Sequence, residues 1–382
     1  NQCMELARRL GPYVLFLAQN RHSSHVVQSL CARISYLARN TQHKPGEHDT
    51  PLSSKEGDEL RKLFEPVLIT DFVQLVQDSN GTHVVRAMLC VCAGVPVVAE
   101  KRGKNAKHGH SVSLAEPLDQ VLDKETLCVN HVHSFAPPEV LMACLRRSLE
   151  HLMSQSEATL QELTCNAASA AVFNLLLRVI FNERLVPWGP ELGSALVQRM
   201  LRWAPAPTHD NEEGVEMVYQ ISGNKSGSFF LEGVLDCAPA AFVVDIIRRG
   251  IADRPCTVRD GPNTAVEFAL DSSANYVLQA CLRRLQREVT TVTECTKDAR
   301  KTSRLLLKEL LATAPNTDDA DASTTGTTCA HVSKMCGTRG GVVLSMLSLV
   351  GALEATSSSS GSNSSSSSSS SRSNSIGFYK RR

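Results

Sequence analysis

Residues 272–282 carry the sequence Ser272-Ser-Ala-Asn-Tyr-Val-Leu-Gln-Ala-Cys-Leu282, and this stretch decides the fold of the chain. On a helix, Asn275 and Gln279 stand four residues apart and share one face, and Tyr276 lies beside that face. The aliphatic side chains that turn the opposite way, toward a core, are Val277, Leu278 and Leu282. One helix therefore presents an amide pair and an aromatic ring on its open side.

The same arrangement returns along the chain. Three further copies, at residues 23–30, 81–88 and 227–234, keep a small residue, a polar residue, a flat side chain, an aliphatic pair and a second polar residue. Two weaker copies, at residues 168–175 and 340–347, keep the small and aliphatic residues but lose the polar ones. Self-similarity of this kind is typical of helical units that bury their apolar faces only by stacking. We therefore predict an all-α fold, a curved α-solenoid.

This motif resembles the second helix of Pumilio (PUF) repeats, and the resemblance covers most of the chain. It implies that two polar residues four apart contact a base edge of single-stranded RNA, while the flat residue between them stacks on the bases. The implied base-edge residues are Ser24, Gln28, Thr82, Arg86, Ser228, Glu232, Asn275 and Gln279. The implied stacking residues are His25, His83, Phe229 and Tyr276.

The resemblance also implies base preferences. Asn275 and Gln279 with Tyr276 resemble a uracil reader, Ser24 and Gln28 with His25 an adenine reader, and Ser228 and Glu232 with Phe229 a guanine reader. Thr82, His83 and Arg86 match no standard triplet. In the weak copies, Ala170 and Val342 occupy the stacking position, and Phe173 and Ser345 occupy the second polar position.

We assign residues 1–355 to one helical repeat domain with irregular insertions at about 40–57, 94–137 and 313–328. Residues 356–382 form a tail rich in Ser, which cannot bury enough apolar surface to order itself. Uneven spacing and insertions make the chain most similar to the divergent nucleolar branch of Pumilio-like proteins in small-subunit ribosome biogenesis. That resemblance implies binding to pre-ribosomal RNA in 18S rRNA processing, in the nucleus and nucleolus, by a monomer with pre-ribosomal proteins as candidate further partners.

The charge balance restricts how RNA could be bound. The chain holds 40 Lys and Arg against 39 Asp and Glu, so binding through bulk phosphate neutralisation is disfavoured and any affinity must be local. Candidate phosphate contacts in the second insertion are Lys101, Arg102, Lys104 and Lys107, although a solvated loop tip has the same composition. The Arg283-Arg284 pair is interpreted as helix-end charge that complements a helix dipole.

The sequence gives little support for a metal site, a membrane span or an enzyme. The 13 cysteines include no CxxC pair and are interpreted as reduced core thiols, so we expect no metal and no cofactor. No apolar run reaches the roughly 18 residues of a membrane span. The carboxylates are dispersed, and we expect no enzyme. The alternatives that stay open are a HEAT-like or armadillo-like protein-binding scaffold, in which the amides and rings only solvate or pack helices, and a cytoplasmic Pumilio-type mRNA regulator.

Overall fold

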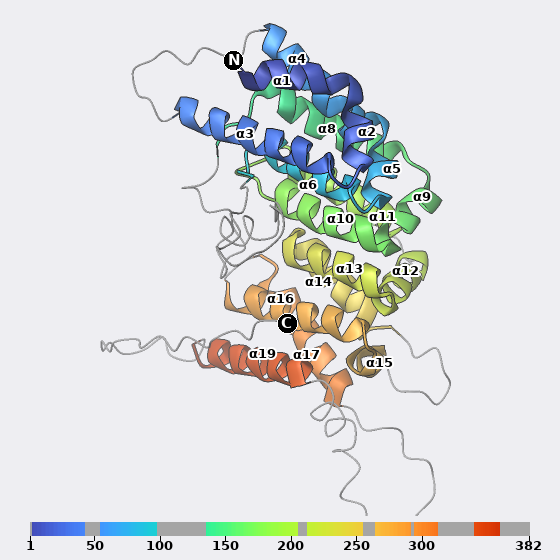
Figure 1. Cartoon of the computed structure of the whole chain (residues 1–382). Helices are drawn as coiled ribbons and strands as arrows, with labels where there is room; N and C mark the ends of the chain where they lie inside the picture. The colour runs from blue at the N-terminus through green and yellow to red at the C-terminus, as the bar shows by residue number, and fades with distance from the viewer. Residues whose placement is uncertain are drawn as a thin grey trace, which may run out of the picture.

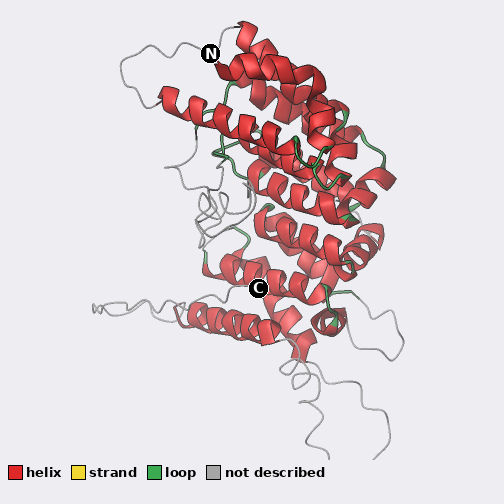
Figure 2. Ribbon diagram, in the orientation of Figure 1, coloured by secondary structure: helices red, strands yellow, loops and turns green. Residues whose placement is uncertain are grey.

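The computed structural model describes residues 2–42, 54–97, 135–204, 212–254, 264–291, 294–311 and 340–359. Every regular element within these ranges is a helix (Figure 2). Six helices stack in chain order along one side of the molecule, from blue to red in Figure 1. These ladder helices are α3 (Ser24–Gln42), α6 (Gly81–Cys92), α10 (Ala167–Ile180), α13 (Lys225–Cys237), α16 (Ala274–Thr290) and α19 (Gly340–Ser359). The solenoid predicted from the repeats is confirmed.

The helices that precede the ladder helices lie behind them and are mostly broken in two (Figure 1). In the first two repeats these are α1 (Gln2–Leu10), η1 (Gly11–Tyr13) and α2 (Val14–Gln19), followed by α4 (Ser54–Glu65), η2 (Pro66–Thr70) and α5 (Phe72–Gln77). In the middle repeats they are α8 (Glu139–Ser154), α9 (Glu157–Cys165), α11 (Gly189–Met200) and α12 (Glu212–Gly223). In the last two they are α14 (Ala240–Ile247), η3 (Arg248–Ala252), α15 (Thr264–Leu270) and α17 (Thr296–Leu311).

An Asn or Asp side chain starts five of the ladder helices. The cap residues are Asn20, Asp78, Asn166, Asn224 and Asp271. Each side-chain oxygen accepts hydrogen bonds from the backbone N–H groups two and three residues later. These N–H groups have no partner inside the helix, so the cap stabilises its first turn. The cap also supplies a common origin, and positions below are counted from it.

The third position after the cap must be small. A Cβ added at Gly81 or Gly227 would lie 2.6 Å from the backbone oxygen of Leu75 or Ile221, the residue three before each cap. At the same position in α10, the Ser169 hydroxyl donates to the Leu163 oxygen. The ladder helix thus begins in direct contact with the backbone of the helix before it, which explains the small residue in the motif.

The apolar faces of both helix layers meet in one continuous core. Phe173 of α10 and Phe230 of α13 are fully buried there and contact edge to face, with ring centroids 6.1 Å apart. The nine described cysteines are free thiols, and the six that are buried are Cys3, Cys31, Cys90, Cys92, Cys144 and Cys281. Burial raises the pKa of Cys90 to about 12 and that of Cys144 to about 11. These thiols are therefore core residues with little thiolate at neutral pH.

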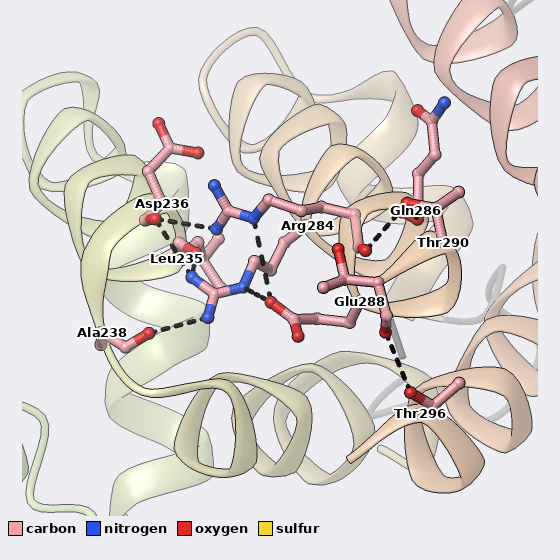
Figure 3. A network of polar contacts seen from close by, with 10 residues as sticks. Leu235, Asp236, Ala238, Arg284, Gln286, Glu288, Thr290 and Thr296 are labelled. Atoms are coloured by element: carbon pink, nitrogen blue, oxygen red, sulfur yellow. Dashed lines mark hydrogen bonds and ion pairs between the residues drawn. The ribbon is translucent and has the colours of Figure 1, made fainter. Parts of the chain in front are cut away.

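A buried arginine joins two successive ladder helices (Figure 3). The Arg284 guanidinium of α16 donates to the backbone oxygens of Leu235, Asp236 and Ala238 at the end of α13. Its Nε donates to Glu288 over 2.7 Å, and both side chains are under 10% exposed. The prediction that the Arg283-Arg284 pair is charge at the end of its own helix is wrong, because α16 continues to Thr290. Arg284 instead complements the dipole at the C-terminal end of α13, the preceding ladder helix.

The described helices extend into the first predicted insertion. α3 continues to Gln42 and α4 begins at Ser54, with Gly57 inside it, so residues 43–53 are the part of the interval that lies outside the described residues. At the second insertion, Val95, Val97 and Phe135 are buried, and Phe135 N–H donates to the Gly94 oxygen over 2.9 Å. The third insertion and residues 360–382 of the tail lie outside the described residues.

Among the described helices, no single one is long and apolar enough to span a membrane; α9 and α10, bent by 98° at the break between them, meet the length and composition criteria only as a pair.

Candidate nucleic-acid interface

On four of the five capped ladder helices, the fifth position after the cap carries a flat side chain that stands out from the helix. His25 and His83 are exposed, Phe229 is 40% exposed and Tyr276 is 39% exposed. All four predicted stacking residues therefore occupy the same position of their helices, α3, α6, α13 and α16, on the surface that we call the ladder face. Large rings that are held at their base by a rigid helix and open at their flat side can stack on planar ligands.

The fourth position after each cap is buried beneath these rings. Ser24, Thr82, Ser228 and Asn275 are at most 5% exposed. Each donates to the backbone oxygen three residues earlier, at Arg21, Ser79, Lys225 and Ser272. The four predicted residues are thus brought to equivalent places, where they also fasten the first turn of their own helix.

The eighth position differs from helix to helix. Gln279 is half-buried and donates to the Asn275 side-chain oxygen over 3.1 Å, which gives the paired amides predicted for this copy. Glu232 is also half-buried. Gln28 is only 1% exposed, and neither end of its amide has a hydrogen-bond partner among the described residues. Burying an amide without hydrogen-bond partners costs free energy. Among the four residues predicted at this position, Gln28 is the one whose amide lacks partners on both ends.

On α6 the fifth and eighth positions contact each other. An Arg86 Nη2 lies 2.8 Å from the Nδ1 of His83, and the Arg86 Nε donates to the Thr82 backbone oxygen over 3.4 Å. Burial, then the charge of Arg86 and then that of His25, lower the pKa of His83. Burial also lowers the pKa of the Arg86 guanidinium. This part of the ladder face, on α6, is therefore positively charged, and α6 packs directly on α3.

The third copy lies one residue away from the frame predicted from the sequence. Counted from the cap at Asn166, the fourth, fifth and eighth positions are Ala170, Ala171 and Asn174, whereas the motif placed them at Ser169, Ala170 and Phe173. Ser169 occupies the small third position, and Phe173 is core. The physical reason is that Ala and Ser can fill either frame, while only one frame lets the Asn166 side chain cap the helix. Caps four residues before each reader are the signal that identifies the correct frame.

Asn174 is a polar residue that the motif search missed. It is 7% exposed, donates to the Phe229 backbone oxygen over 3.2 Å and accepts from the Arg178 Nε over 2.9 Å. Because both ends of its amide are already hydrogen-bonded, α10 presents neither a ring nor an unpaired amide on the ladder face. Asn174 therefore links α10 to α13.

A groove of about 600 Å³ crosses the ladder face from α10 over α13 to α16. Its lining includes the rings of Phe229 and Tyr276, the small Ala170 side chain, the polar Ser228 and Glu232, and Lys225 at the start of α13. An open site with two aromatic walls, a carboxylate and an ammonium group suits a planar, polar ligand that carries a negative charge.

At the last ladder step, α19 packs on the reader pair of α16. A Cβ added at Gly341 would lie 2.6 Å from the Gln279 side-chain oxygen, so the glycine permits this close approach. Val342, predicted at a weak stacking position, is fully buried. This weak copy therefore covers the side of Gln279 and adds no ring to the ladder face.

The candidate phosphate contacts Lys101, Arg102, Lys104 and Lys107 fall outside the described residues.

Comparison with known proteins agrees with this architecture. The family model of the NOP9-like PUF repeat domain matches residues 1–376. Nucleolar protein 9 of Trichophyton verrucosum (strain HKI 0517) is 23% identical over 307 residues, which cover 75% of this chain and 40% of that protein. Nucleolar protein 9 of Yarrowia lipolytica (strain CLIB 122 / E 150) is 21% identical over 282 residues, covering 72% of this chain and 35% of that protein. The chain spans about 40% of the length of the curated relatives it matches.

Solved structures support the same fold. The structure of APUM23-GGAUUUGACGG matches with a TM-score of 0.60 at 17% identity, covering 92% of this chain and 52% of that one. The structure of APUM23-GGAAUUGACGG matches with the same TM-score at 18% identity. With the repeats, the caps and the ladder of helices, the match over nearly the whole sequence shows that this chain belongs to the NOP9-like PUF repeat domain family.

Proposed function

We propose that the chain is an RNA-binding domain that holds single-stranded segments of pre-ribosomal RNA on its ladder face during small-subunit ribosome biogenesis. The observation that carries the proposal is the exposure of four flat side chains at the same position of four ladder helices, at His25, His83, Phe229 and Tyr276. Nucleobases of any kind stack on such rings, and each stacked base contributes about 1–3 kcal/mol.

The groove between α10 and α16 supplies the polar part of the interaction. Phe229 and Tyr276 supply two aromatic walls, and Ser228 and Glu232 line the same groove, where they would contact a base edge. Lys225 also lines the groove and would contact a backbone phosphate of the same strand. The groove can therefore take a base between its rings and a phosphate at its edge.

The name Nucleolar protein 9 of the relatives supports a nucleolar site of action. As the ligand there we propose RNA of the 18S rRNA precursor. The RNA GGAUUUGACGG in the name of the matched structure suggests a first ligand to test, because it contains uracil, adenine and guanine. We propose a role in binding and shielding RNA, without catalysis, as a monomer that also contacts pre-ribosomal proteins.

The test measures fluorescence anisotropy of labelled GGAUUUGACGG with the purified chain, beside the same RNA annealed to its complement. We expect the single strand to bind and the duplex to bind far more weakly, because stacked bases in a duplex are closed to the rings. Equal affinity for both forms, or no affinity for either, would contradict the proposal and favour a protein-binding scaffold.

A further inference from the structure

The ladder step formed by α3 and α6 carries basic side chains without a described acidic partner. Arg86 is half-buried, and no described carboxylate forms an ion pair with it. Other half-buried or buried arginines do have such partners, since Arg249 contacts Asp245 and Arg284 contacts Glu288. His25 of α3 lies close enough to influence the pKa of His83. The step therefore leaves a positive charge uncompensated at the protein surface.

The contact between Arg86 and His83 fixes how these groups present their protons. A guanidinium only donates hydrogen bonds, so the Nδ1 of His83, 2.8 Å from Nη2, must accept. The ring proton of the neutral imidazole is then on Nε2, which faces away from Arg86. The remaining Arg86 N–H groups and the His83 Nε2–H form a surface of donors only.

Such a surface favours a phosphate over a base. Arg86 is held against its own helix by two contacts, to the His83 ring and to the Thr82 oxygen, and the Thr82 hydroxyl is turned to the Ser79 oxygen. These two contacts hold the guanidinium close to the surface of α6. A phosphate needs only nearby donors and positive charge, and it can come down to the helix surface. Guanine, whose N7 and O6 are both acceptors, is the competing ligand that an experiment must separate.

We propose that Arg86 and His83 form a phosphate-binding site on α6, at the N-terminal part of the ladder face, which holds one backbone phosphate of the bound strand and reads no base. The inference rests on the RNA-binding function proposed above. It gives Thr82, His83 and Arg86 a role that does not depend on base identity, and it places a positive charge on α6, separated by α10 from the rings of Phe229 and Tyr276.

The test is the salt dependence of RNA affinity. Binding of labelled GGAUUUGACGG is measured from about 50 mM to about 200 mM salt for the wild-type chain and for Arg86→Gln, Arg86→Lys and Arg304→Gln. Arg304 is an exposed arginine on α17, away from the ladder, so its substitution removes the same charge elsewhere. One lost phosphate contact lowers the slope of log K against log salt by about 0.7 for a single strand.

We expect Arg86→Gln to lower the slope by this amount, and Arg86→Lys and Arg304→Gln to keep the wild-type slope. An abasic scan of the RNA should give the same profile for Arg86→Gln as for the wild type. An unchanged slope in Arg86→Gln, with loss of the preference for one guanine, would overturn the phosphate-binding site while leaving RNA binding intact. Absence of wild-type binding at every salt concentration would overturn the proposed function together with this inference.

Discussion

Asn174 of α10 donates a hydrogen bond from its side chain to the Phe229 backbone oxygen over 3.2 Å, so α10 is bonded directly to α13, the helix that carries the exposed Phe229 ring. We predict that Asn174→Ala lowers the free energy of unfolding by about 1–3 kcal/mol, because it removes the hydrogen bond to α13 and leaves the Arg178 guanidinium without its partner. RNA affinity at equal folded fraction should not change. Urea titration followed by anisotropy checks both, with the exposed Gln220→Ala as a control expected within about 0.5 kcal/mol. Weaker RNA binding by folded Asn174→Ala would show that this amide reads a base.

The connection between Arg284 and the end of α13 should be among the largest single contributions to stability. Arg284→Met removes the nearer cation of the buried Glu288 and leaves only Arg287, 3.8 Å away. It also removes the side-chain donor of the Leu235 and Ala238 oxygens, while the Asp236 oxygen keeps its hydrogen bond from Arg287. We expect a cost of about 3 kcal/mol in urea unfolding. Adding Glu288→Met should restore much of the loss, because the poorly compensated buried charge is removed as well. The adjacent, exposed Arg283→Met is the matched control and should be near neutral. A small effect of Arg284→Met would contradict the assignment.

Gly227 and Gly223 form a natural pair for testing the close contact at the start of a ladder helix. Gly227→Ala places a Cβ 2.6 Å from the Ile221 oxygen, and we expect a loss of about 1–3 kcal/mol in unfolding free energy. Gly223→Ala meets nothing within 4 Å and should be neutral or stabilise by up to about 1 kcal/mol through helix propensity. Thermal unfolding of both variants measures the difference, and equal behaviour would show that the backbone contact carries no cost.

Stability should depend on pH through His83. Its pKa is lowered in the folded chain by burial and by the charges of Arg86 and His25, whereas an unfolded His titrates near about 6.5. Below that pH the unfolded state takes up the proton first, so the folded state loses stability as pH falls toward the lowered pKa. The unfolding free energy of the wild type relative to His83→Gln should therefore decrease between neutral and acidic pH in urea titrations. A difference that stays constant, or rises, across this interval would contradict the contact.

How far the sequence alone predicts this molecule can be seen at single helices. At Tyr276 and Phe229, the alternation of small, flat and aliphatic residues was sufficient to predict both the ladder helix and the exposed ring. In α10 the same search missed the frame, because Ala168-Ser-Ala-Ala171 is uniformly small and only the cap at Asn166 distinguishes the positions. The roles of Arg284 and Asn174 could not be predicted, since their partners are backbone atoms of another repeat, brought near only by stacking. The burial of Gln28 has the same origin.

The ladder face is tested most directly by removing its two aromatic walls. Phe229→Ala, Tyr276→Ala and the double variant are compared with the wild type in anisotropy titrations of labelled GGAUUUGACGG, and Phe16→Ala, which removes a 71% exposed ring from α2, is the control. We predict losses of about 1–3 kcal/mol for each single variant and a larger loss for the double variant, with unchanged thermal unfolding and no effect of the control. Wild-type affinity in the folded double variant would contradict the claim that RNA bases stack on this face.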